Sequence, residues 1–168
     1  MRTIRAAARN LALVLALAGG AVGLTASPAA AATPTCDTSH MIELRSGIYD
    51  PAKHKYFFWL FLPMDTGKQT YDCISRQGHP KNEGARTVQQ MLNLCYNQGL
   101  TIDGIFGSDT FAALKNAQTW AKYVEGHPSL AVDGVYGLQT ARAVRWPVHI
   151  SPTKASDWTC KSFPDIGK

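Results

Sequence analysis

The chain has 168 residues and a formal net charge of +5 at pH 7, from 17 Lys and Arg against 12 Asp and Glu. Three of the arginines lie within the first nine residues, and the remainder carries 14 basic against 12 acidic side chains without any basic run. A nucleic acid or an anionic membrane would select a clustered basic surface, so this composition argues against both as partners.

Residues 1–32 are predicted to form a secretory signal peptide. The three early arginines precede a stretch of apolar or small residues, 11–24, and a run of small residues ends at Ala32. These are the three parts of an export signal, although an uncleaved N-terminal anchor is the alternative. We expect cleavage between Ala32 and Thr33. The product would be secreted, extracellular or associated with the cell wall, with no membrane partner after cleavage.

The predicted mature chain contains an even number of cysteines: Cys36, Cys73, Cys95 and Cys160. Two disulfides are the natural interpretation for an exported protein. A zinc site needs closely spaced ligands such as C-x-x-C, and the nearest two cysteines here are 22 residues apart. Composition and spacing therefore predict disulfides and no metal, and they leave all three possible pairings open.

Residues 33–72 are predicted to form a β-rich N-terminal arm. The run Lys55–Leu62 is densely aromatic and is followed by Pro63, which is typical of a strand buried on both faces. Segments 41–44 and 71–74 are its expected partners. An exposed platform on which sugar rings stack is the alternative. The buried strand is favoured, because an exposed patch this apolar would promote aggregation.

The most informative feature is an internal repeat with a period of thirty residues. Residues 100–114 align without gaps on residues 130–144, with six of fifteen positions identical. Such a repeat indicates one supersecondary unit used twice. Each copy carries Asp-Gly, an aromatic residue, a second Gly and a Thr. The shared positions are Asp103, Gly104, Gly107 and Thr110 in the first copy and Asp133, Gly134, Gly137 and Thr140 in the second.

Each Asp-Gly pair predicts a sharp turn, because Asp accepts hydrogen bonds from nearby backbone and Gly tolerates positive φ. Ser108 is expected to cap the helix that follows the first turn. The alternative for Asp103 and Asp133 is a catalytic or calcium-binding pair. It is disfavoured, because a calcium loop needs several oxygen ligands at alternating positions and this pattern supplies one.

Three helices are predicted around these turns. Apolar residues at positions i, i+3, i+7 and i+10 predict a helix over 85–96, and Gly99 is a plausible stop beyond it. A second helix is expected over 109–123 and a third, shorter one over 138–145. The segment therefore has the order helix, Asp-Gly turn, helix, Asp-Gly turn, helix.

This order and these motifs resemble the three-helix peptidoglycan-binding domain family, a wall-targeting module of many bacterial hydrolases. The resemblance covers about residues 73–147. It implies a mainly α fold, a three-helix bundle with two Asp-Gly loops, joined to the β-rich arm and to a C-terminal tail, 148–168. The matching positions are Val88, Gln89, Leu92, Asp103–Thr110, Gln118 and Asp133–Thr140.

Two departures from the family pattern concern the second helix. Ala117 stands where the family usually has Phe, and the interval from Gln118 to Asp133 is longer than usual. Trp120 and Tyr123 are the candidates for filling the vacated core volume.

Exported members of the family further resemble this chain around two of its cysteines, at 73–78 and 93–96. That resemblance implies the pairing Cys73–Cys95, and it leaves Cys36–Cys160 to tie the ends of the chain together.

The sequence gives no sign of an enzyme. Its five histidines show no zinc-binding spacing, an even number of cysteines argues against a free thiolate nucleophile, and its carboxylates are scattered. We therefore predict no catalytic residue, no metal and no cofactor. The resemblance implies instead a non-catalytic protein whose partner is peptidoglycan.

Ligand contacts are expected on the polar side of the first helix and around the third. Peptidoglycan offers sugar hydroxyls, amides and carboxylates, which suit Asn, Gln, Arg and aromatic side chains. Each candidate also has a structural interpretation, with Tyr136 and Trp146 in the core. The candidates are Gln90, Asn93, Tyr96, Asn97, Tyr136, Arg142, Arg145 and Trp146.

Two competing functions stay open. The protein could be a secreted protein-binding factor, an inhibitor or adhesin that uses the N-terminal arm as its interface, since fold does not fix function. It could also be an accessory to a cell-wall hydrolase.

Overall fold

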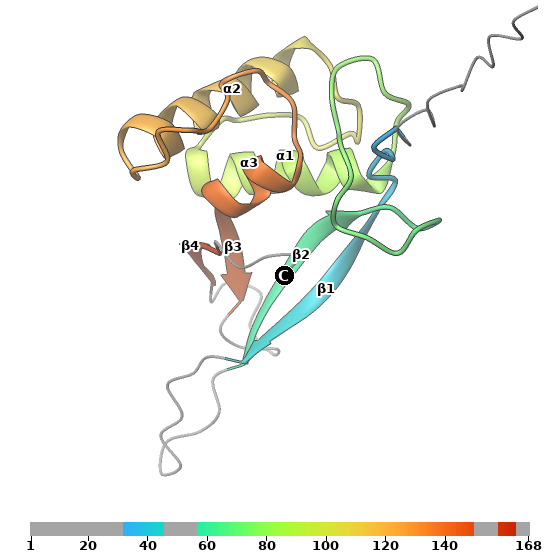
Figure 1. Ribbon diagram of the computed structural model, residues 1–168, viewed down its shortest axis with the longest axis horizontal. Helices are drawn as coiled ribbons and strands as arrows, with labels where there is room; N and C mark the ends of the chain where they lie inside the picture. The colour runs from blue at the N-terminus through green and yellow to red at the C-terminus, as the bar shows by residue number, and fades with distance from the viewer. Residues whose placement is uncertain (1–31, 46–56, 150–157, 164–168) are drawn as a thin grey trace, which may run out of the picture. The chain divides into compact units, whose positions relative to one another are not determined.

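The computed structural model describes residues 32–45, 57–149 and 158–163, so the predicted signal peptide lies outside the described residues except for Ala32. The described residues all belong to one compact unit. No helix among them is both long and apolar enough to cross a membrane. The elements in chain order are β1 (Thr38–Arg45), β2 (Phe57–Met64), α1 (Glu83–Tyr96), α2 (Ser108–Tyr123), α3 (Leu138–Ala143), β3 (Arg145–His149) and β4 (Trp158–Ser162) (Figure 1).

The three predicted helices are present, with ends shifted by at most two residues. Asn82 caps α1, since its side chain accepts a hydrogen bond from the Ala85 amide at 2.7 Å. The helix ends at Asn97, which adopts the left-handed conformation (φ 52°) two residues before Gly99. α3 stops at Ala143 because the next residue, Val144, is extended (φ −82°, ψ 160°) and leads directly into β3.

The predicted cap at Ser108 is wrong. The residue at the cap position of α2 is Gly107, which has no side chain to offer. Ser108 is already the first helical residue, and its hydroxyl donates to Asp109 Oδ1 at 3.3 Å. The start of α2 therefore depends on backbone contacts, such as the Phe111 amide donating to the Gly107 carbonyl at 3.0 Å.

The strands form one antiparallel sheet with the order β1-β2-β3-β4. The aromatic strand is confirmed as β2, and its partner 41–44 lies within β1. The other expected partner, 71–74, is not in this sheet: Ile74 forms an isolated parallel bridge with Thr35. Since β3 and β4 come from beyond the third helix, strand is not confined to the N-terminal arm. The fold is α+β, and the description as mainly α is too narrow.

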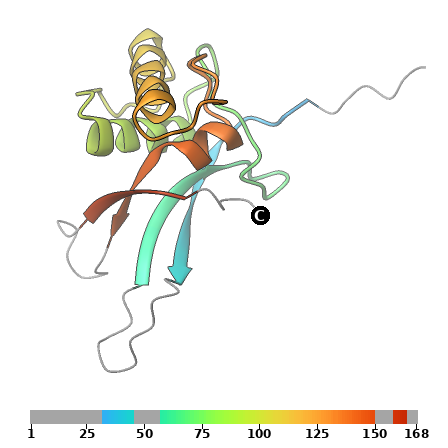
Figure 2. The ribbon, with the colours of Figure 1, turned by 60° about the vertical axis from the view of Figure 1, so that its left-hand side comes forward.

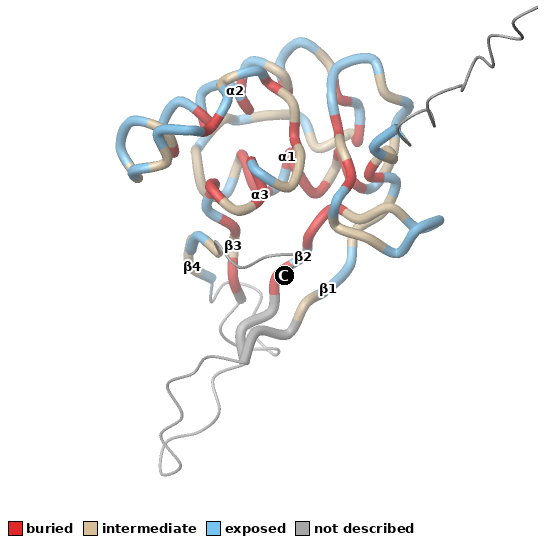
Figure 3. Tube along the Cα trace, viewed as in Figure 1, coloured by how far each residue is buried: buried red, intermediate tan, exposed pale blue. Residues whose placement is uncertain are grey.

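One face of the sheet packs under the helices, with α1 lying against β1, β2 and β3 (Figure 2). Leu60 and Leu62 point toward α1 and are fully buried. The residue between them, Phe61, lies on the opposite face and is 45 % exposed. The prediction that β2 is buried on both faces is therefore wrong at Phe61. Figure 3 shows the buried stretches along α1, β2 and β3, whereas residues 38–42 of β1 are exposed or intermediate.

All four cysteines form disulfides, as predicted, but the predicted pairing is wrong. The bonds are Cys36–Cys73 and Cys95–Cys160, not Cys73–Cys95 and Cys36–Cys160. Backbone hydrogen bonds across Cys36 explain the first bond, because they hold its segment beside Ile74. β4 runs alongside β3, which packs against α1, and this brings Cys160 to the end of that helix.

Of the aromatic side chains predicted to lie in the core, two are buried there and the two candidates on α2 are not. Trp120 and Tyr123 are 48 % and 74 % exposed, so the prediction that they replace the missing Phe is wrong. Trp146 and Tyr136 are buried instead, in an edge-to-face pair with ring centroids 5.9 Å apart. The indole N–H of Trp146 donates to the Ala141 carbonyl at 2.8 Å, so its one polar atom is satisfied.

Candidate functional site

A buried glutamine on α1 makes hydrogen bonds to the first Asp-Gly turn. We call this turn the first corner, and the equivalent turn in the second copy of the repeat the second corner. The Gln89 carboxamide nitrogen donates to Asp103 Oδ1 (2.8 Å), the Ile105 carbonyl (3.0 Å) and Thr110 Oγ1 (3.1 Å). Its oxygen accepts from the Gly104 amide at 2.8 Å. Gln89 therefore bonds both the backbone and the side chains of this loop. The hydrogen bond from Gln89, more than any other contact, holds the pKa of Asp103 below its usual value.

The second corner repeats the first with Gln118, on α2, in the same role. Its carboxamide nitrogen donates to Asp133 Oδ1 (2.9 Å), the Val135 carbonyl (3.1 Å) and Thr140 Oγ1 (3.1 Å), while its oxygen accepts from the Gly134 amide (2.8 Å). The two copies of the repeat thus make equivalent sets of hydrogen bonds, and each set joins one helix to the start of the next. The residues that the two copies share make their hydrogen bonds within the fold.

Both aspartates of the corners act as turn residues. The Ile105 amide donates to Asp103 Oδ1 and the Val135 amide to Asp133 Oδ1, at 2.8 and 2.9 Å. Gly104 follows with φ 78°, a conformation that residues with a side chain rarely adopt. Within the described ranges, no group of three or more His, Cys, Asp or Glu side chains is arranged to hold a metal ion.

Three of the predicted ligand residues make contacts within the fold: two are buried in the core, and one bonds the backbone. Tyr136 and Trp146 are 1 % and 0 % exposed, so neither offers a surface to a ligand. Asn93 clamps the backbone after α1: its amide donates to the Leu100 carbonyl and its oxygen accepts from the Leu100 amide, both at 2.7 Å.

Two further predicted residues, Gln90 on α1 and Asn97 at its C-terminal cap, are exposed. Neither lines the cleft or the groove described below.

Tyr96 and Arg145 lie together, as part of a cluster that the sequence did not suggest. The Tyr96 hydroxyl accepts from the Arg145 amide at 2.8 Å. Burial, opposed in part by this bond and reinforced by nearby Glu125, raises the pKa of Tyr96 to about 12. The Arg145 side chain pairs with Glu125 Oε1, which also accepts from Trp120 Nε1 at 3.2 Å. We call these four residues the Glu125 cluster.

Glu125 is the buried centre of this cluster. Its side chain is only 8 % exposed, whereas that of Arg145 is 44 % exposed. Its second oxygen, Oε2, has no hydrogen-bond partner in the part of the chain that the structure describes. A carboxylate so placed is costly unless its partners stay fixed. The end of α2 is thereby tied to the first residue of β3.

A cleft of about 270 Å³ lies between α3 and the loop after α2. The loop folds back on α2, since the His127 amide donates to the Ala121 carbonyl at 3.2 Å, and Lys122 donates to the Leu130 carbonyl at 3.0 Å. Of the predicted ligand residues, only Arg142 lines this cleft. The lining residues are His127, Ser129, Leu130, Gln139, Arg142 and Ala143.

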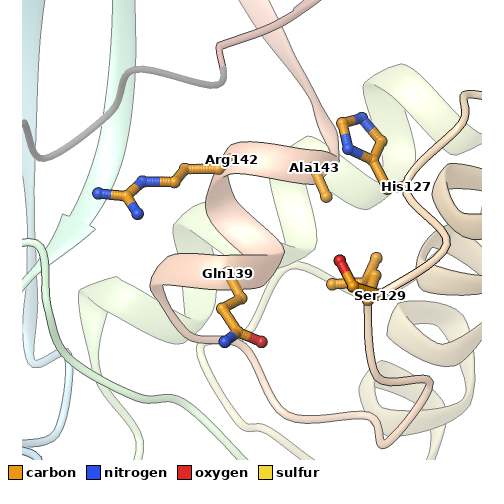
Figure 4. A pocket seen from close by; sticks show the side chains of 6 residues that line it. His127, Ser129, Gln139, Arg142 and Ala143 are labelled. Carbon is orange, nitrogen blue, oxygen red and sulfur yellow. The ribbon is translucent and has the colours of Figure 1, made fainter.

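Figure 4 shows how these side chains lie. His127 and Ser129 approach α3 from the loop, and Ala143 faces the space between them. Arg142 leaves α3 on the other side, with its guanidinium directed away from His127. The centre of the cleft thus presents an imidazole, a hydroxyl and an apolar floor, and a carboxamide stands at its edge. These groups can bind amides and hydroxyls.

Sequence reasoning missed His127, Ser129 and Gln139. One signal could have found the first two, namely the lengthened interval between Gln118 and Asp133. An added loop that does not fill the core has to lie on the surface, where it can build one wall of a cleft.

A second hollow, a groove of about 440 Å³, runs between the residues after α1 and the start of α2. Its polar lining includes the hydroxyls of Thr101 and Ser108 and the carboxylates of Asp103 and Asp109. The first corner forms one of its walls, so the groove is a consequence of how α1 and α2 are joined.

Three helices joined by two glutamine-bonded corners, with shallow polar hollows beside them, form one small module. Residues 81–144 match a family model described as "Putative peptidoglycan binding domain". Over this segment, the match confirms the resemblance to the three-helix peptidoglycan-binding domain family. The match spans the three helices and both corners and leaves out every strand. Neither the search of curated proteins nor that of solved structures found a significant match.

Proposed function

We propose that this protein is secreted and binds the peptidoglycan of a bacterial cell wall, without cutting it, through residues 81–144. The observation that carries the proposal is the family match over both glutamine-locked corners. The corners fix the three helices rigidly, and a rigid frame is what a recognition surface needs.

The cleft beside α3 supports the choice of ligand. Peptidoglycan presents hydroxyls, N-acetyl and peptide amides, and carboxylates. His127, Ser129 and Gln139 supply donors and acceptors for the first two, and Ala143 supplies an apolar floor. A cleft this small and open would bind weakly, so attachment to a wall with many repeated sites would depend on avidity.

The disulfides support export. Both bonds lie in the part of the chain that follows the predicted signal peptide, and such bonds persist in oxidising compartments. They also bear on catalysis, because all four cysteines are used and none is left as a thiolate nucleophile.

The test is retention of residues 33–168 on purified, protein-free sacculi, with and without competing muropeptides. We expect retention that muropeptides reverse, and no release of wall fragments during prolonged incubation. The variant His127→Ala/Gln139→Ala should bind about fivefold to tenfold more weakly, from the loss of two ligand hydrogen bonds. Lys68→Ala, in an exposed turn outside the matched segment, is the control. Failure of the unmodified protein to bind sacculi refutes the proposal.

A second candidate, a secreted protein-binding factor, is favoured by one observation. Met41 and Phe61 are direct neighbours across β1 and β2, and they are 51 % and 45 % exposed. Exposed apolar side chains that lie together often mark an interface with another protein. The same experiment separates the candidates, because a protein-binding factor would not be retained on protein-free sacculi.

A further inference from the structure

The exposed side of α2 carries two aromatic rings that the core does not use. Trp120 and Tyr123 are 48 % and 74 % exposed. They are three positions apart in the helix, so their side chains are neighbours on its surface. Exposed polar residues extend the same helix surface toward its start. We call the whole set the α2 face: Lys115, Asn116, Thr119, Trp120 and Tyr123.

The indole of Trp120 is fixed by its polar edge. Its N–H donates to Glu125 Oε1, and Glu125 is buried and paired with Arg145. The hydrogen-bonding capacity of the ring is therefore used within the protein, while about half of the side chain stays open to solvent. What Trp120 offers a partner is ring surface. A ring that is already held loses little conformational freedom when it binds.

The charge around these rings is positive. Lys115 and Lys122 are the charged residues of α2 beyond its first turn, and the only acid in the helix is Asp109, at its start. Lys122 lies 5.8 Å from the centre of the Tyr123 ring and is also bonded to the Leu130 carbonyl. Lys115, one helical turn and a half from Trp120, is exposed. The α2 face thus combines flat apolar surface, an amide, a hydroxyl and a cation.

We propose that the α2 face binds the glycan strand of peptidoglycan, with pyranose rings stacked on Trp120 and Tyr123 and with Lys115 facing a carboxylate of the attached peptide. This proposal rests on the proposed function and names the part of the wall that is recognised. The apolar faces of sugar rings fit the aromatic surfaces, and their polar edges fit Asn116 and Thr119. The negative charge of the peptide carboxylates complements the lysine.

The experiment compares two probes: whole sacculi, and soluble glycan strands from which an amidase has removed the peptides. Trp120→Ala and Tyr123→Ala should each weaken binding to both probes about threefold to tenfold, and Trp120→Phe should stay within about twofold of the unmodified protein. Lys115→Ala should weaken binding to sacculi more than binding to peptide-free strands, on which the freed lactyl carboxylates are the only anionic groups left for the lysine. Leu94→Ala removes an exposed apolar side chain on α1 and is the matched control.

The outcomes separate this proposal from the one on which it rests. If the unmodified protein does not bind sacculi, both the proposed function and the assignment of the α2 face are overturned. If the unmodified protein binds sacculi and Trp120→Ala/Tyr123→Ala binds them equally well, the α2 face is not the glycan site and wall binding stands. Weaker binding of that variant to sacculi with unchanged binding to peptide-free strands would also overturn the assignment to sugar. Thermal unfolding of each variant checks the fold: little change is expected for Tyr123→Ala, whereas Trp120→Ala should lower stability modestly, because buried Glu125 loses a hydrogen-bond donor.

Discussion

At the scale of single residues, the fold depends on two carboxamides with no access to solvent. Gln89 and Gln118 are 2 % and 1 % exposed, and each makes four hydrogen bonds. A buried polar group is tolerated only when its bonds are satisfied, and its removal deprives each of its buried partners of one hydrogen bond. These glutamines therefore contribute more to stability than the aspartates of the corners, which are partly solvated.

Replacing Gln118 tests this directly. Gln118→Ala leaves the Gly134 amide without its acceptor and opens a cavity. It also removes one bond each from the Val135 carbonyl and the Thr140 hydroxyl, which keep the bond to each other. We expect the free energy of unfolding to fall by about 2–4 kcal/mol, measured by urea denaturation. Gln90→Ala, an exposed position on α1, should change it by less than about 0.5 kcal/mol. Equal effects of the two substitutions would contradict a locking role.

A second prediction concerns the glycine of the second corner. Gly134 has φ 71°, and a Cβ there would overlap the ring of Phe111, on α2. Gly134→Ala should therefore cost more than about 2 kcal/mol, from backbone strain and steric overlap together. Gly137, in the same loop, is extended (φ −160°), and a Cβ there would meet only Ile74 Cγ2 at 3.7 Å.

Gly137→Ala is thus the matched control for Gly134→Ala, and it should cost less than about 1 kcal/mol. Thermal or urea unfolding of the two variants gives the comparison. A Gly134 variant as stable as the Gly137 variant would show that the corner can adopt another backbone conformation.

The sequence revealed these corners because their chemistry is local. The Asp-Gly pair, the second Gly and the Thr lie within eight positions of one another, and the copy thirty residues later marks them as a unit. The Glu125 cluster could not be found in this way. It joins Tyr96, Trp120, Glu125 and Arg145, which come from two helices, a loop and a strand. No spacing rule connects them until the sheet is in place.

At the scale of elements, the sheet was predicted only where its hydrophobic pattern is long. β2 has eight residues and was found, while β3 and β4 have five each and were missed. Pro147, which pairs with Cys160, lies within β3, and a proline argues against a strand that has neighbours on both sides. The disulfide pairing was wrong for the same reason. Cys160 reaches Cys95 through β4, an element that had not been foreseen.

The pairing can be checked with a tryptic digest of the unreduced protein. Lys and Arg residues place the four cysteines in four separate peptides: the one ending at Arg45, 69–76, 87–115 and 155–161. Mass spectrometry should find the first joined to 69–76 and 87–115 joined to 155–161. A linked pair 69–76 with 87–115 would restore the pairing implied by the exported family members.

Removing each bond tests what the disulfides contribute. The loops that they close have 37 and 65 residues. Loop-closure entropy predicts that Cys36→Ser/Cys73→Ser and Cys95→Ser/Cys160→Ser each lower the free energy of unfolding by roughly 4 kcal/mol. The second variant should also expose β4 to proteolysis, because its covalent tie to α1 is lost. A protease-resistant tail would mean that pairing with β3 alone holds it.

At the scale of the whole molecule, the family-matched segment and the sheet share one core. Gly84, in the first turn of α1, lets the backbone of Cys36 approach, since a Cβ there would lie 2.8 Å from the Cys36 carbonyl carbon. Leu60, Leu62 and Trp146 are buried in the same cluster as the helices. The sheet therefore covers a face of α1 that would otherwise be exposed. It leaves the α2 face and the cleft beside α3 open for recognition.

As the pH falls, the free energy of unfolding should decrease in two separate pH ranges. Each range is set by titratable groups in a different part of the chain. Burial, with Arg76 nearby, lowers the pKa of His79 below its ordinary value of 6.5. As the pH falls below that value, the unfolded chain takes up this proton before the folded protein does, so stability is lost. Two carboxyls act in the lower range, because the pKa values of Asp37 and Asp103 lie below the ordinary 3.8.

The two aspartates contribute stability that is present above pH 3.8 and is lost as the pH falls through their folded pKa values. For Asp37 the main cause is the hydrogen bond from the Thr66 amide, at 2.8 Å, and for Asp103 it is the one from Gln89. Urea unfolding from pH 2 to 8 should therefore show a first decline beginning near 6.5 and a second below about 4. His79→Gln should remove only the first decline. Asp37→Asn/Asp103→Asn should flatten only the second, and a single decline that is unchanged in both variants would contradict this division.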